Sequence, residues 1–521
     1  MRRPLRASRL GVFIALRLGA LAAATAVVAA SSTPWPMGGQ NISNTRSSSS
    51  QINPQNVKQL KVKWTFHTHG DVSATPAVVG GAVYFPDWGG YMNKVDATTG
   101  ALIWQRTIDS YIGSAPNSGP NVARTSPAVV GNTVYIGDQQ LGRLMAINAT
   151  TGALLWSSYI GGGDSFPIVT QSPVVYNGEV YVGVASAEEN VVAFVPNYPC
   201  CHDRGSFSAV NAKTGHVDWT TYTTVLGYSG AGVWGSTAAI DPGTNTVYIA
   251  TGNNYSVPDA AKQCQQNGGT PVECLDPGNF VDSVLALDMS TGAITWGSKL
   301  APGYDDWNVA CIFNQYNPGG CPTDPGPDFD FGSGPLLFTT GKGRKVVGAG
   351  QKSGDFWTLD ARTGEVLTQT HGGPGATLGG IEWGSSVDGK SVYVAEANAN
   401  FTPYTGAGGQ TIYAGSWAAI NPNTGQVVWQ TADPGGYMTL GPTSVANGVV
   451  YAGSMTGGMY ALDAQNGKIL WSFQGEGASN AGAAVVDGTV YWGNGYSHLN
   501  SPAFFLGAPS NTFYAFSVNG S

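Results

Sequence analysis

The chain has 521 residues, enough for one large repetitive domain or for two or three ordinary ones. Only 11% of the residues are charged, whereas there are 74 glycines, 15 tryptophans and 23 tyrosines, a composition that disfavours helices and favours short strands joined by tight turns. The net charge of −8 argues against a nucleic-acid partner or an anionic membrane surface.

The first 30 residues have the pattern of an export signal. Arginines precede the apolar run LGALAAATAVVAA, which ends in small residues suited to cleavage near Ala30. A membrane anchor is the alternative, although the uninterrupted apolar run is too short to span a bilayer comfortably. We expect residues 1–30 to be a signal peptide and 31–59 an N-terminal extension, and the mature protein to be secreted or periplasmic without stable membrane insertion.

Downstream of residue 60 the chain repeats one pattern. TPAVVGGAVYFPDWGGYMNKVDATTGALIW, at 75–104, returns at 126–156 as SPAVVGNTVYIGDQQLGRLMAINATTGALLW. Further copies end at Trp219, Trp296, near Gly364, at Trp429 and at Trp471, and the last runs from AGAAVVDGTVYWGNG to TFYAFSV. Self-similarity of this kind is the signature of a repeat architecture.

Each copy contains three short alternating runs and then a turn, x-x-T-G, that leads to a run ending in Trp. This is the pattern of antiparallel hairpins, and four such strands repeated radially form a propeller blade. The last copy lacks its Trp-ending run, while KVKWTF at 61–66 is a spare run of that type. The sequence therefore predicts an all-β, eight-bladed β-propeller at 60–521, with its ring closed by the N-terminal strand.

The Trp-ending runs resemble the repeat of pyrroloquinoline quinone (PQQ) enzymes, in which the blade-end Trp docks against a Gly of a neighbouring blade. The resemblance covers essentially the whole mature chain. The same repeat also occurs in non-catalytic outer-membrane assembly scaffolds. The repeat therefore indicates the fold, and the chemistry has to be argued from the site residues.

Six cysteines in an exported chain favour disulfides, and their order allows three local bridges: Cys200–Cys201, Cys264–Cys274 and Cys311–Cys321. Adjacent cysteines seldom pair because the ring strains the intervening peptide, so unrelated thiols or other pairings remain the alternative for the first two. Cys200 and Cys201, followed by Arg204, resemble the vicinal disulfide of PQQ-dependent alcohol dehydrogenases, which packs on one face of the quinone. Their place in the third blade resembles the polyvinyl alcohol dehydrogenase branch.

The resemblance implies several further site residues. Trp234 lies outside the T-G-x-x-x-W position of the packing tryptophans and is expected to stack on the second face of PQQ, although blade packing is the commoner role of such a residue. Asn253, in TGNN, is expected to bind a metal ion. Glu188, in VGVASAEEN, is the second expected ligand, with Glu189 as its alternative. Oxygen donors of this kind suit calcium.

The stretch DFDFGSGPLL is expected to carry the third ligand. By the resemblance, Asp328 is both a metal ligand and the general base, and Asp330 supports it; on a strand, carboxylates two residues apart point to one face and can reach one cation. A second carboxylate at this offset makes a lanthanide an alternative to calcium. An ordinary Asp-rich loop is the other interpretation. Asn308 stands where the family pattern, counted from the preceding Trp, has an Asp.

Three more positions match the family and two depart from it. Lys352 matches the basic residue that contacts the quinone oxygens, with a solvated lysine as the alternative, and Thr170 and Arg204 are expected to bind PQQ carboxylates. Ser73 stands where methanol-oxidising members have a Glu, and Glu382 stands where a neutral amide is usual.

These resemblances imply an enzyme that oxidises secondary or polymeric alcohols by hydride transfer to PQQ. The cation polarises a quinone carbonyl, and Asp328 accepts the hydroxyl proton of the alcohol. The chain has no C-x-x-C-H haem motif, so a separate, cytochrome c-like electron acceptor is expected. A non-catalytic propeller that acts as a binding or assembly scaffold is the alternative, and a polysaccharide-binding propeller is a third hypothesis.

Overall fold

The computed structural model describes residue 1 and residues 33–114, 119–300, 303–497 and 507–521. The chain divides into two units, Met1–Ser32 and Thr33–Ser521, and all the described elements belong to the second. The expected signal peptide lies outside the described residues. Within the described ranges, no helix has the length and apolar character needed to cross a membrane.

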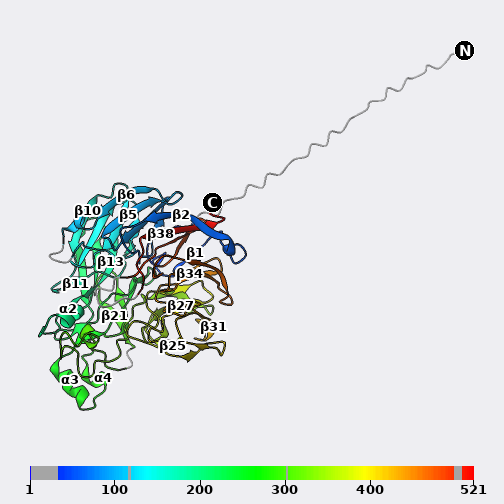
Figure 1. The fold of residues 1–521 in the computed structure, drawn as a ribbon. Coiled ribbons are helices and arrows are strands. Elements are labelled where there is room, and N and C mark those ends of the chain that lie inside the picture. Colours follow the sequence, from blue (N-terminus) through cyan, green and yellow to red (C-terminus); the bar gives the residue numbers. More distant parts are fainter. Residues whose placement is uncertain (2–32, 115–118, 301–302, 498–506) are drawn as a thin grey trace. The chain divides into compact units, whose positions relative to one another are not determined.

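Four-stranded antiparallel sheets follow one another along the chain, as the colours of Figure 1 show. The first sheet consists of β3 (Ala77–Val79), β4 (Ala82–Asp87), β5 (Tyr91–Asp96) and β6 (Leu102–Thr107), and the second of β7 (Ala128–Val130), β8 (Thr133–Gly137), β9 (Arg143–Asn148) and β10 (Leu154–Tyr159). The third contains β12 (Val174–Tyr176), β13 (Glu179–Ser186), β14 (Ser206–Asn211) and β15 (Val217–Tyr222), and the fourth β17 (Ala239–Asp241), β18 (Thr246–Ala250), β20 (Ser283–Asp288) and β21 (Ile294–Lys299).

The other four sheets have the same strand order. They are β22 (Leu336–Thr339), β23 (Lys345–Gly350), β24 (Asp355–Asp360) and β25 (Val366–His371); β26 (Ser386–Val387), β27 (Val392–Glu396), β30 (Ser416–Ile420) and β31 (Val427–Ala432); β32 (Ser444–Ala446), β33 (Val449–Gly453), β34 (Gly458–Asp463) and β35 (Ile469–Gln474); and β36 (Ala484–Val486), β37 (Thr489–Trp492), β38 (Thr512–Val518) and β2 (Leu60–His67).

The last of these sheets closes the ring. Strand β2, near the start of the chain, pairs antiparallel with β38 at its end, from Leu60 opposite Val518 to His67 opposite Thr512. The first strands of most neighbouring sheets contact one another, and β36 of the eighth sheet contacts β3 of the first. The predicted eight-bladed propeller, closed by its N-terminal strand, is confirmed.

Tryptophan docking joins the blades. Trp104 of the first blade donates its indole N–H to the carbonyl of Ala149 in the second (3.0 Å), and a Cβ added to Gly152 would lie 2.9 Å from its ring. A glycine is therefore required at that turn, both for its φ of 72° and for the ring. The fifth blade has no tryptophan at this place, and Thr368 lies against Gly425 instead.

The residues before β2 run along the innermost strands of the propeller. The carbonyls of Pro36, Ile42, Ser43 and Thr45 accept hydrogen bonds from the second, fourth, fifth and sixth blades. Trp35 pairs with β3, and β1 (Ser47–Ser48) pairs parallel with β32 and contacts β36 through a side chain. This stretch, residues 35–48, is named the axial segment below. It ties together blades that are far apart in the sequence.

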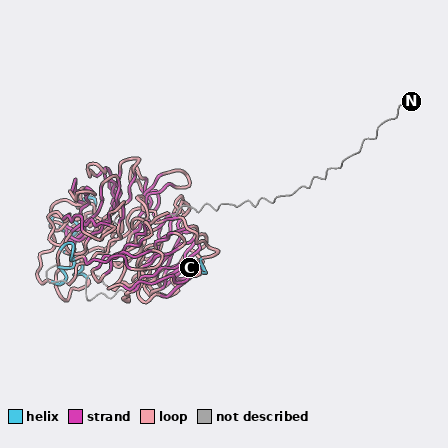
Figure 2. Tube along the Cα trace, turned by 90° about the horizontal axis from the view of Figure 1, so that it is seen from above, coloured by secondary structure: helices cyan, strands magenta, loops and turns pink. Residues whose placement is uncertain are grey.

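Short helices and strands occupy the insertions between blade strands, and Figure 2 shows how small a part of the fold is helical. The helices are α1 (Asp109–Ile112), α2 (Glu188–Phe194), α3 (Asp259–Gln266) and α4 (Pro271–Cys274), with 3₁₀ turns η1 (Val57–Gln59) and η2 (Val309–Cys311). The additional strands are β11 (Pro167–Ile168), β16 (Ser229–Gly230), β19 (Asn254–Ser256), β28 (Tyr404–Thr405) and β29 (Thr411–Ile412). Disulfides Cys264–Cys274 and Cys311–Cys321 close two of the insertions, as the cysteine order suggested.

Candidate active site

A cavity of about 150 Å³ gathers charged and aromatic side chains from widely separated parts of the chain, from Arg124 to Tyr496; we name it the upper chamber. Its charged residues are Arg124, Glu189, Asp328, Asp330, Lys352 and Glu382. Indole and phenol rings form much of the remaining wall: Trp234, Tyr255, Trp307, Trp383 and Tyr496. Because these charged groups share one cavity, each shifts the pKa of its neighbours through its charge.

Asp328, Asp330 and Lys352 form a buried ionic cluster. The Lys352 Nζ lies 3.1 Å from each carboxylate oxygen of Asp328 and 3.5 Å from Oδ2 of Asp330. Asp330 also accepts hydrogen bonds from the backbone N–H of Asn253 (2.6 Å) and from the indole Nε1 of Trp234 (2.9 Å). Burial alone would lower the pKa of Lys352, but the two carboxylates raise it above its ordinary value, so the ammonium stays charged.

The backbone around Asp328 differs from the sequence-based expectation. Residues 328–330 are not in a strand, since β22 begins at Leu336, and Asp328 has a φ of 60°. That left-handed conformation costs a non-glycine residue roughly 1–2 kcal/mol. The Asp305 carboxylate stabilises it by accepting the backbone N–H groups of Asp328 (3.0 Å) and Phe329 (2.7 Å). The turn, and not a strand, brings both carboxylates to Lys352.

Burial raises the pKa of Asp328 well above its ordinary value, and the Lys352 ammonium opposes that shift. The carboxyl group is therefore a stronger base than an exposed aspartate, while a cation at contact distance keeps the ionised form accessible. This is the electrostatic setting that a general base requires.

Trp234 and Trp383 form an aromatic corner of the upper chamber. Their ring centroids lie 5.3 Å apart at an interplanar angle of 77°. The Lys352 ammonium lies 5.3 Å from the centre of the Trp234 ring, a cation–π distance. Trp234 packs against Gly252 and Gly332, where an added Cβ would lie 2.9 and 2.8 Å from its ring, and the ring also borders the cavity.

The two adjacent glutamates have different surroundings. Both carboxylate oxygens of Glu188 are held by the turn that follows α2: Tyr198 Oη donates to one (2.8 Å), and the backbone N–H groups of His202 and Asp203 donate to the pair (2.8 Å each to Oε2). Glu188 does not line the upper chamber, whereas Glu189 does. Burial and the neighbouring Asp330 raise the pKa of Glu189 to about 7.

Asn253 lies behind Asp330 and is buried. Its Nδ2 donates to the carbonyls of Trp307 (2.6 Å) and Asn254 (2.9 Å), and Asn253 does not line the upper chamber. Among the residues that the structure describes, no three His, Cys, Asp or Glu side chains form a ready-made metal site. The Lys352 ammonium holds the position between the two aspartates.

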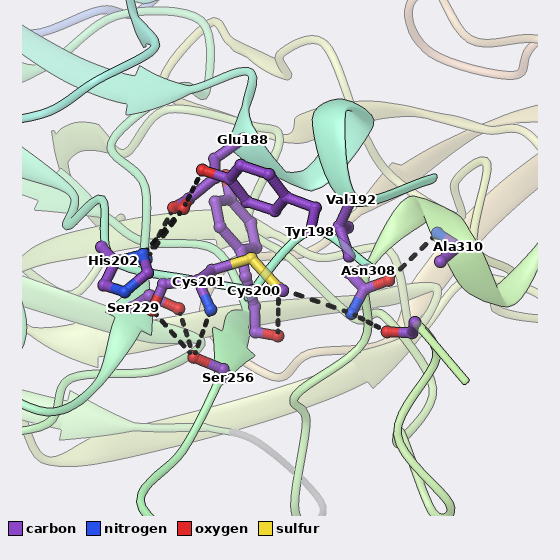
Figure 3. Close-up of a disulfide and its surroundings, with 12 residues drawn as sticks. Glu188, Val192, Tyr198, Cys200, Cys201, His202, Ser229, Ser256, Asn308 and Ala310 are labelled. Carbon is purple, nitrogen blue, oxygen red and sulfur yellow. Dashed lines mark hydrogen bonds and ion pairs between the residues drawn. A yellow bond between two sulfur atoms is a disulfide. The ribbon is translucent and has the colours of Figure 1, made fainter. Parts of the chain in front are cut away.

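Cys200 and Cys201 form the vicinal disulfide, and Figure 3 shows it between α2 and η2. The Cys200 sulfur lies 3.7 Å from the carbonyl oxygen of Tyr255, which borders the upper chamber, and both cysteines pack against the apolar cluster of α2 and η2. Asn308 donates toward the Cys200 sulfur (3.9 Å) and to the carbonyl of Gly320, and it caps η2. The disulfide is therefore a neighbour of the cavity, held from Glu188 on one side and Asn308 on the other.

The remaining sequence-predicted residues divide into two groups. Thr170 and Glu382 line the upper chamber, and burial raises the pKa of Glu382 to about 7. Arg204 does not line it: its guanidinium stacks on Tyr222 at 3.8 Å and donates to the carbonyl of Thr224. Ser73 lies in a second, deeper cavity.

Sequence reasoning missed Arg124 and Asp305. Arg124 stacks on Trp383 at 4.8 Å and faces the upper chamber. An alignment of the repeats contains the signal, because Arg124 in RTSP and Thr170 in TQSP each stand two residues before a Ser-Pro that opens a blade. Asp305 had no such signal, since it acts on backbone N–H groups of a loop 23 residues away.

Comparison with known proteins identifies the family. The family model described as "Glucose/ethanol/alcohol dehydrogenase, beta-propeller domain" matches residues 35–307, more than half of the chain. The chain therefore belongs to the PQQ-dependent alcohol dehydrogenase family. A second model, "Outer membrane protein assembly factor BamB", matches residues 413–499.

Individual relatives agree with this assignment. The chain is 29% identical to a polyvinylalcohol dehydrogenase of Pseudomonas sp, over 94% of this chain and 78% of that protein. Its fold is similar to the quinohemoprotein alcohol dehydrogenase of Comamonas testosteroni (TM-score 0.68, 21% identity, 94% and 81% of the two chains). It is also similar in fold to a europium-containing methanol dehydrogenase (TM-score 0.66, 18% identity, 93% and 98%).

The side chains of the upper chamber fit the cofactor of this family. PQQ is a flat, multiply anionic molecule, and the chamber offers indole surface, the guanidinium of Arg124 and the hydroxyl of Thr170. The carboxylates of Glu189, Asp328 and Asp330 outnumber the single lysine beside them, so the donor set also suits a hard cation.

Proposed function

We propose that the protein is an exported PQQ-dependent dehydrogenase that oxidises secondary or polymeric alcohols. One observation carries the proposal: a buried aspartate of raised pKa, Asp328, shares one cavity with a lysine, indole rings and three further acids. A propeller that served only as a scaffold would have no need to bury so many ionisable groups together, because each costs desolvation energy.

The chain's own residues divide the task of holding the reactants. Glu189, Asn253, Asp328 and Asp330 would hold a calcium or lanthanide ion through oxygen atoms. Trp234 and the Cys200–Cys201 disulfide would flank the ring of PQQ. Thr170 and Arg124 would bind its carboxylates, and Lys352 its ring oxygens.

Oxidation of a secondary alcohol to a ketone removes a hydride equivalent from carbon and a proton from oxygen. PQQ, when bound with its cation, supplies the two-electron acceptor. Asp328 accepts the hydroxyl proton, and its raised pKa favours that transfer. Lys352 opposes the rise in the pKa of Asp328 and so favours its ionised, proton-accepting form.

The proposed substrate rests on the similarity to a relative, and the proposed electron acceptor rests on the need to reoxidise the cofactor. The match to a polyvinylalcohol dehydrogenase over 78% of that protein favours secondary hydroxyl groups, including polymeric ones. The reduced cofactor must be reoxidised, so we propose a separate cytochrome c-like acceptor. Three disulfides suit an oxidising, extracytoplasmic compartment.

Reconstitution of the purified protein tests the proposal. We expect PQQ together with Ca²⁺ or La³⁺ to produce alcohol-dependent dye reduction, strongest with secondary alcohols and polyvinyl alcohol. Asp328→Asn should lower the rate by about 10² to 10⁴-fold, because the base is lost. Asp324→Asn, an exposed aspartate four residues away, is the matched control and should keep the wild-type rate.

The same experiment separates an enzyme from a scaffold. Dye reduction that proceeds without PQQ, or that no alcohol supports, would favour the scaffold hypothesis. The match of the outer-membrane assembly factor model to 413–499 would then become the better guide to function.

A further inference from the structure

A second cavity of about 50 Å³ lies next to the upper chamber, and Arg124, Thr170, Trp383 and Tyr496 border both; we name it the lower chamber. At about 30 Å³ per water molecule, it has room for one small ion and at most one water beside it. Arg46 of the axial segment lines it. The chamber is thus closed in part by residues that precede the propeller in the sequence.

Arg46 is a buried cation without a carboxylate partner. Its side chain is 2% exposed, and its guanidinium donates to three neutral groups: the carbonyls of Thr443 (2.9 Å) and Gly38 (2.8 Å) and the hydroxyl of Thr75 (2.8 Å). Among the described residues it takes part in no ion pair within 4 Å. Three bonds leave two of its five N–H donors unused.

The absence of a side chain at Gly482 leaves space for the Arg46 guanidinium. A Cβ on Gly482 would lie 2.1 Å from Nη2 of Arg46, so a side chain there would displace it. Burial without a counter-charge lowers the pKa of Arg46 to about 9. A buried charge of this kind is costly unless an opposite charge accompanies it.

Three serine hydroxyls around the lower chamber keep their protons free to donate to a ligand. The oxygens of Ser126, Ser172 and Ser236 each accept a backbone N–H, from Thr75 (3.0 Å), Ser126 (2.9 Å) and Gly334 (2.8 Å). In the described part of the chain, none of these three hydroxyls donates to a protein acceptor. A serine hydroxyl has one proton to donate, and each of these is therefore left for a ligand.

Two further groups complete the lining. Nε of Arg124 is buried without a protein partner, although the rest of its guanidinium is near the acids of the upper chamber. Asn480 presents an unpaired acceptor, its Oδ1, which suits a water molecule beside the ligand. The side chains that line the lower chamber therefore offer more free hydrogen-bond donors and cations than acceptors.

We propose that the lower chamber binds a small inorganic anion of the halide class, held by Arg46 and by the hydroxyls of Ser126, Ser172 and Ser236. The anion supplies the counter-charge that Arg46 lacks and joins the axial segment to the second, third and fourth blades. The site does not depend on the proposed function, because none of the four residues that hold the anion is assigned to PQQ or to the cation.

Crystals of the full-length, PQQ-free protein soaked in sodium bromide test the proposal directly. We expect an anomalous bromine peak in the lower chamber, within hydrogen-bonding distance of Arg46 and the serine hydroxyls. An ordered water at that position with no anomalous signal would overturn the proposal. The same soak of the Arg106→Met variant, in which an exposed arginine is removed, should leave the peak unchanged.

A solution measurement covers the case in which an Arg46→Met variant fails to fold. The unfolding midpoint of the wild type should rise with bromide and saturate, and sodium gluconate at equal ionic strength should not reproduce the rise. In the Ser172→Ala/Ser236→Ala double variant, the apparent bromide dissociation constant should increase at least ten-fold. An unchanged constant, or an equal rise in gluconate, would contradict the assigned site.

Discussion

Glu188 and Glu189 show how finely the site depends on single residues. They are adjacent at the start of α2, yet one carboxylate binds the turn that carries the disulfide and the other faces the upper chamber. Successive residues on a helix point about 100° apart, so only one of the two can reach the cavity. We therefore assign the cation-binding role to Glu189 and a positioning role to Glu188.

A pair of variants tests this division. Glu189→Gln removes a negative charge from the proposed ion site and should weaken La³⁺ binding at least ten-fold, as measured by calorimetry. Glu188→Gln should leave that affinity within about three-fold and instead lower the free energy of unfolding by roughly 1–3 kcal/mol, because two buried backbone N–H groups lose their charged acceptor. If Glu188→Gln weakened La³⁺ binding and Glu189→Gln did not, Glu188 would be the ligand instead.

Glu396, at the end of β27, gives a pH prediction that is independent of the site. It is fully buried, its Oε2 has no hydrogen-bond partner among the described residues, and burial raises its pKa from 4.5 to about 8. The folded protein therefore binds one more proton than the unfolded chain between these values. The contribution of Glu396 to the free energy of unfolding is therefore complete below pH 4.5 and is lost as the pH rises through 8. The loss is at most about 5 kcal/mol.

Urea denaturation at pH 5, 7 and 9 measures this effect. The Glu396→Gln variant should lose less stability than the wild type between pH 5 and 9, since its amide does not titrate. Glu365→Gln, at an exposed glutamate, should follow the wild-type curve. Parallel curves for all three proteins would contradict the burial argument.

Blade junctions are the elements that hold the propeller together. At most junctions a tryptophan of one blade meets a glycine of the next, and β2 makes such a junction with the first blade through Trp64, whose indole donates to the carbonyl of Ala97 (3.1 Å). A strand that begins the chain thus joins the last blade to the first. The ring needs no covalent bond to close.

Two glycines of the second blade separate the effect of docking from that of backbone strain. Gly152 (φ 72°) lies against Trp104, whereas Gly131 (φ 59°) has no atom within 4 Å of the place a Cβ would take. Both Ala variants incur the cost of a left-handed residue, about 1–2 kcal/mol. Gly152→Ala should cost about 1–3 kcal/mol more in urea denaturation, because the new methyl displaces the indole. Equal losses would mean that docking contributes little.

The axial segment acts at the scale of the whole molecule. It bonds to inner strands from the first blade to the eighth, so it couples units that otherwise touch only their neighbours. At a net 0.5–1.5 kcal/mol per hydrogen bond, the seven backbone hydrogen bonds between the axial segment and these strands contribute on the order of 5 kcal/mol to the stability of the fold.

Removing residues 33–48 while keeping β2 tests that coupling. We expect the ring to form but with a free energy of unfolding lower by several kcal/mol. Hydrogen exchange should accelerate at the backbone amides that the segment binds, those of Val129, Ile240, Leu337 and Val387. Removal of residues 1–32 alone is the control and should leave these rates unchanged.

The sequence by itself determined the architecture and several of the residues around the upper chamber. Strand periodicity, the T-G turn and the terminal tryptophan are local features, so eight copies predict eight blades and a spare strand predicts the closure. Thr170, Trp234, Asp330 and Lys352, singled out from motifs, all line the same cavity.

Only the tertiary structure decided which neighbour of a pair faces inward and which distant groups support it. Side-chain direction on α2 separates Glu188 from Glu189, a turn held by Asp305 aims Asp328, and Arg204 stacks on Tyr222 away from the cavity. The burial of Arg46 was equally invisible, because the axial segment has no periodicity and its contacts lie up to about 400 residues away. Contacts of that separation depend on how the ring closes, and no local pattern of residues records them.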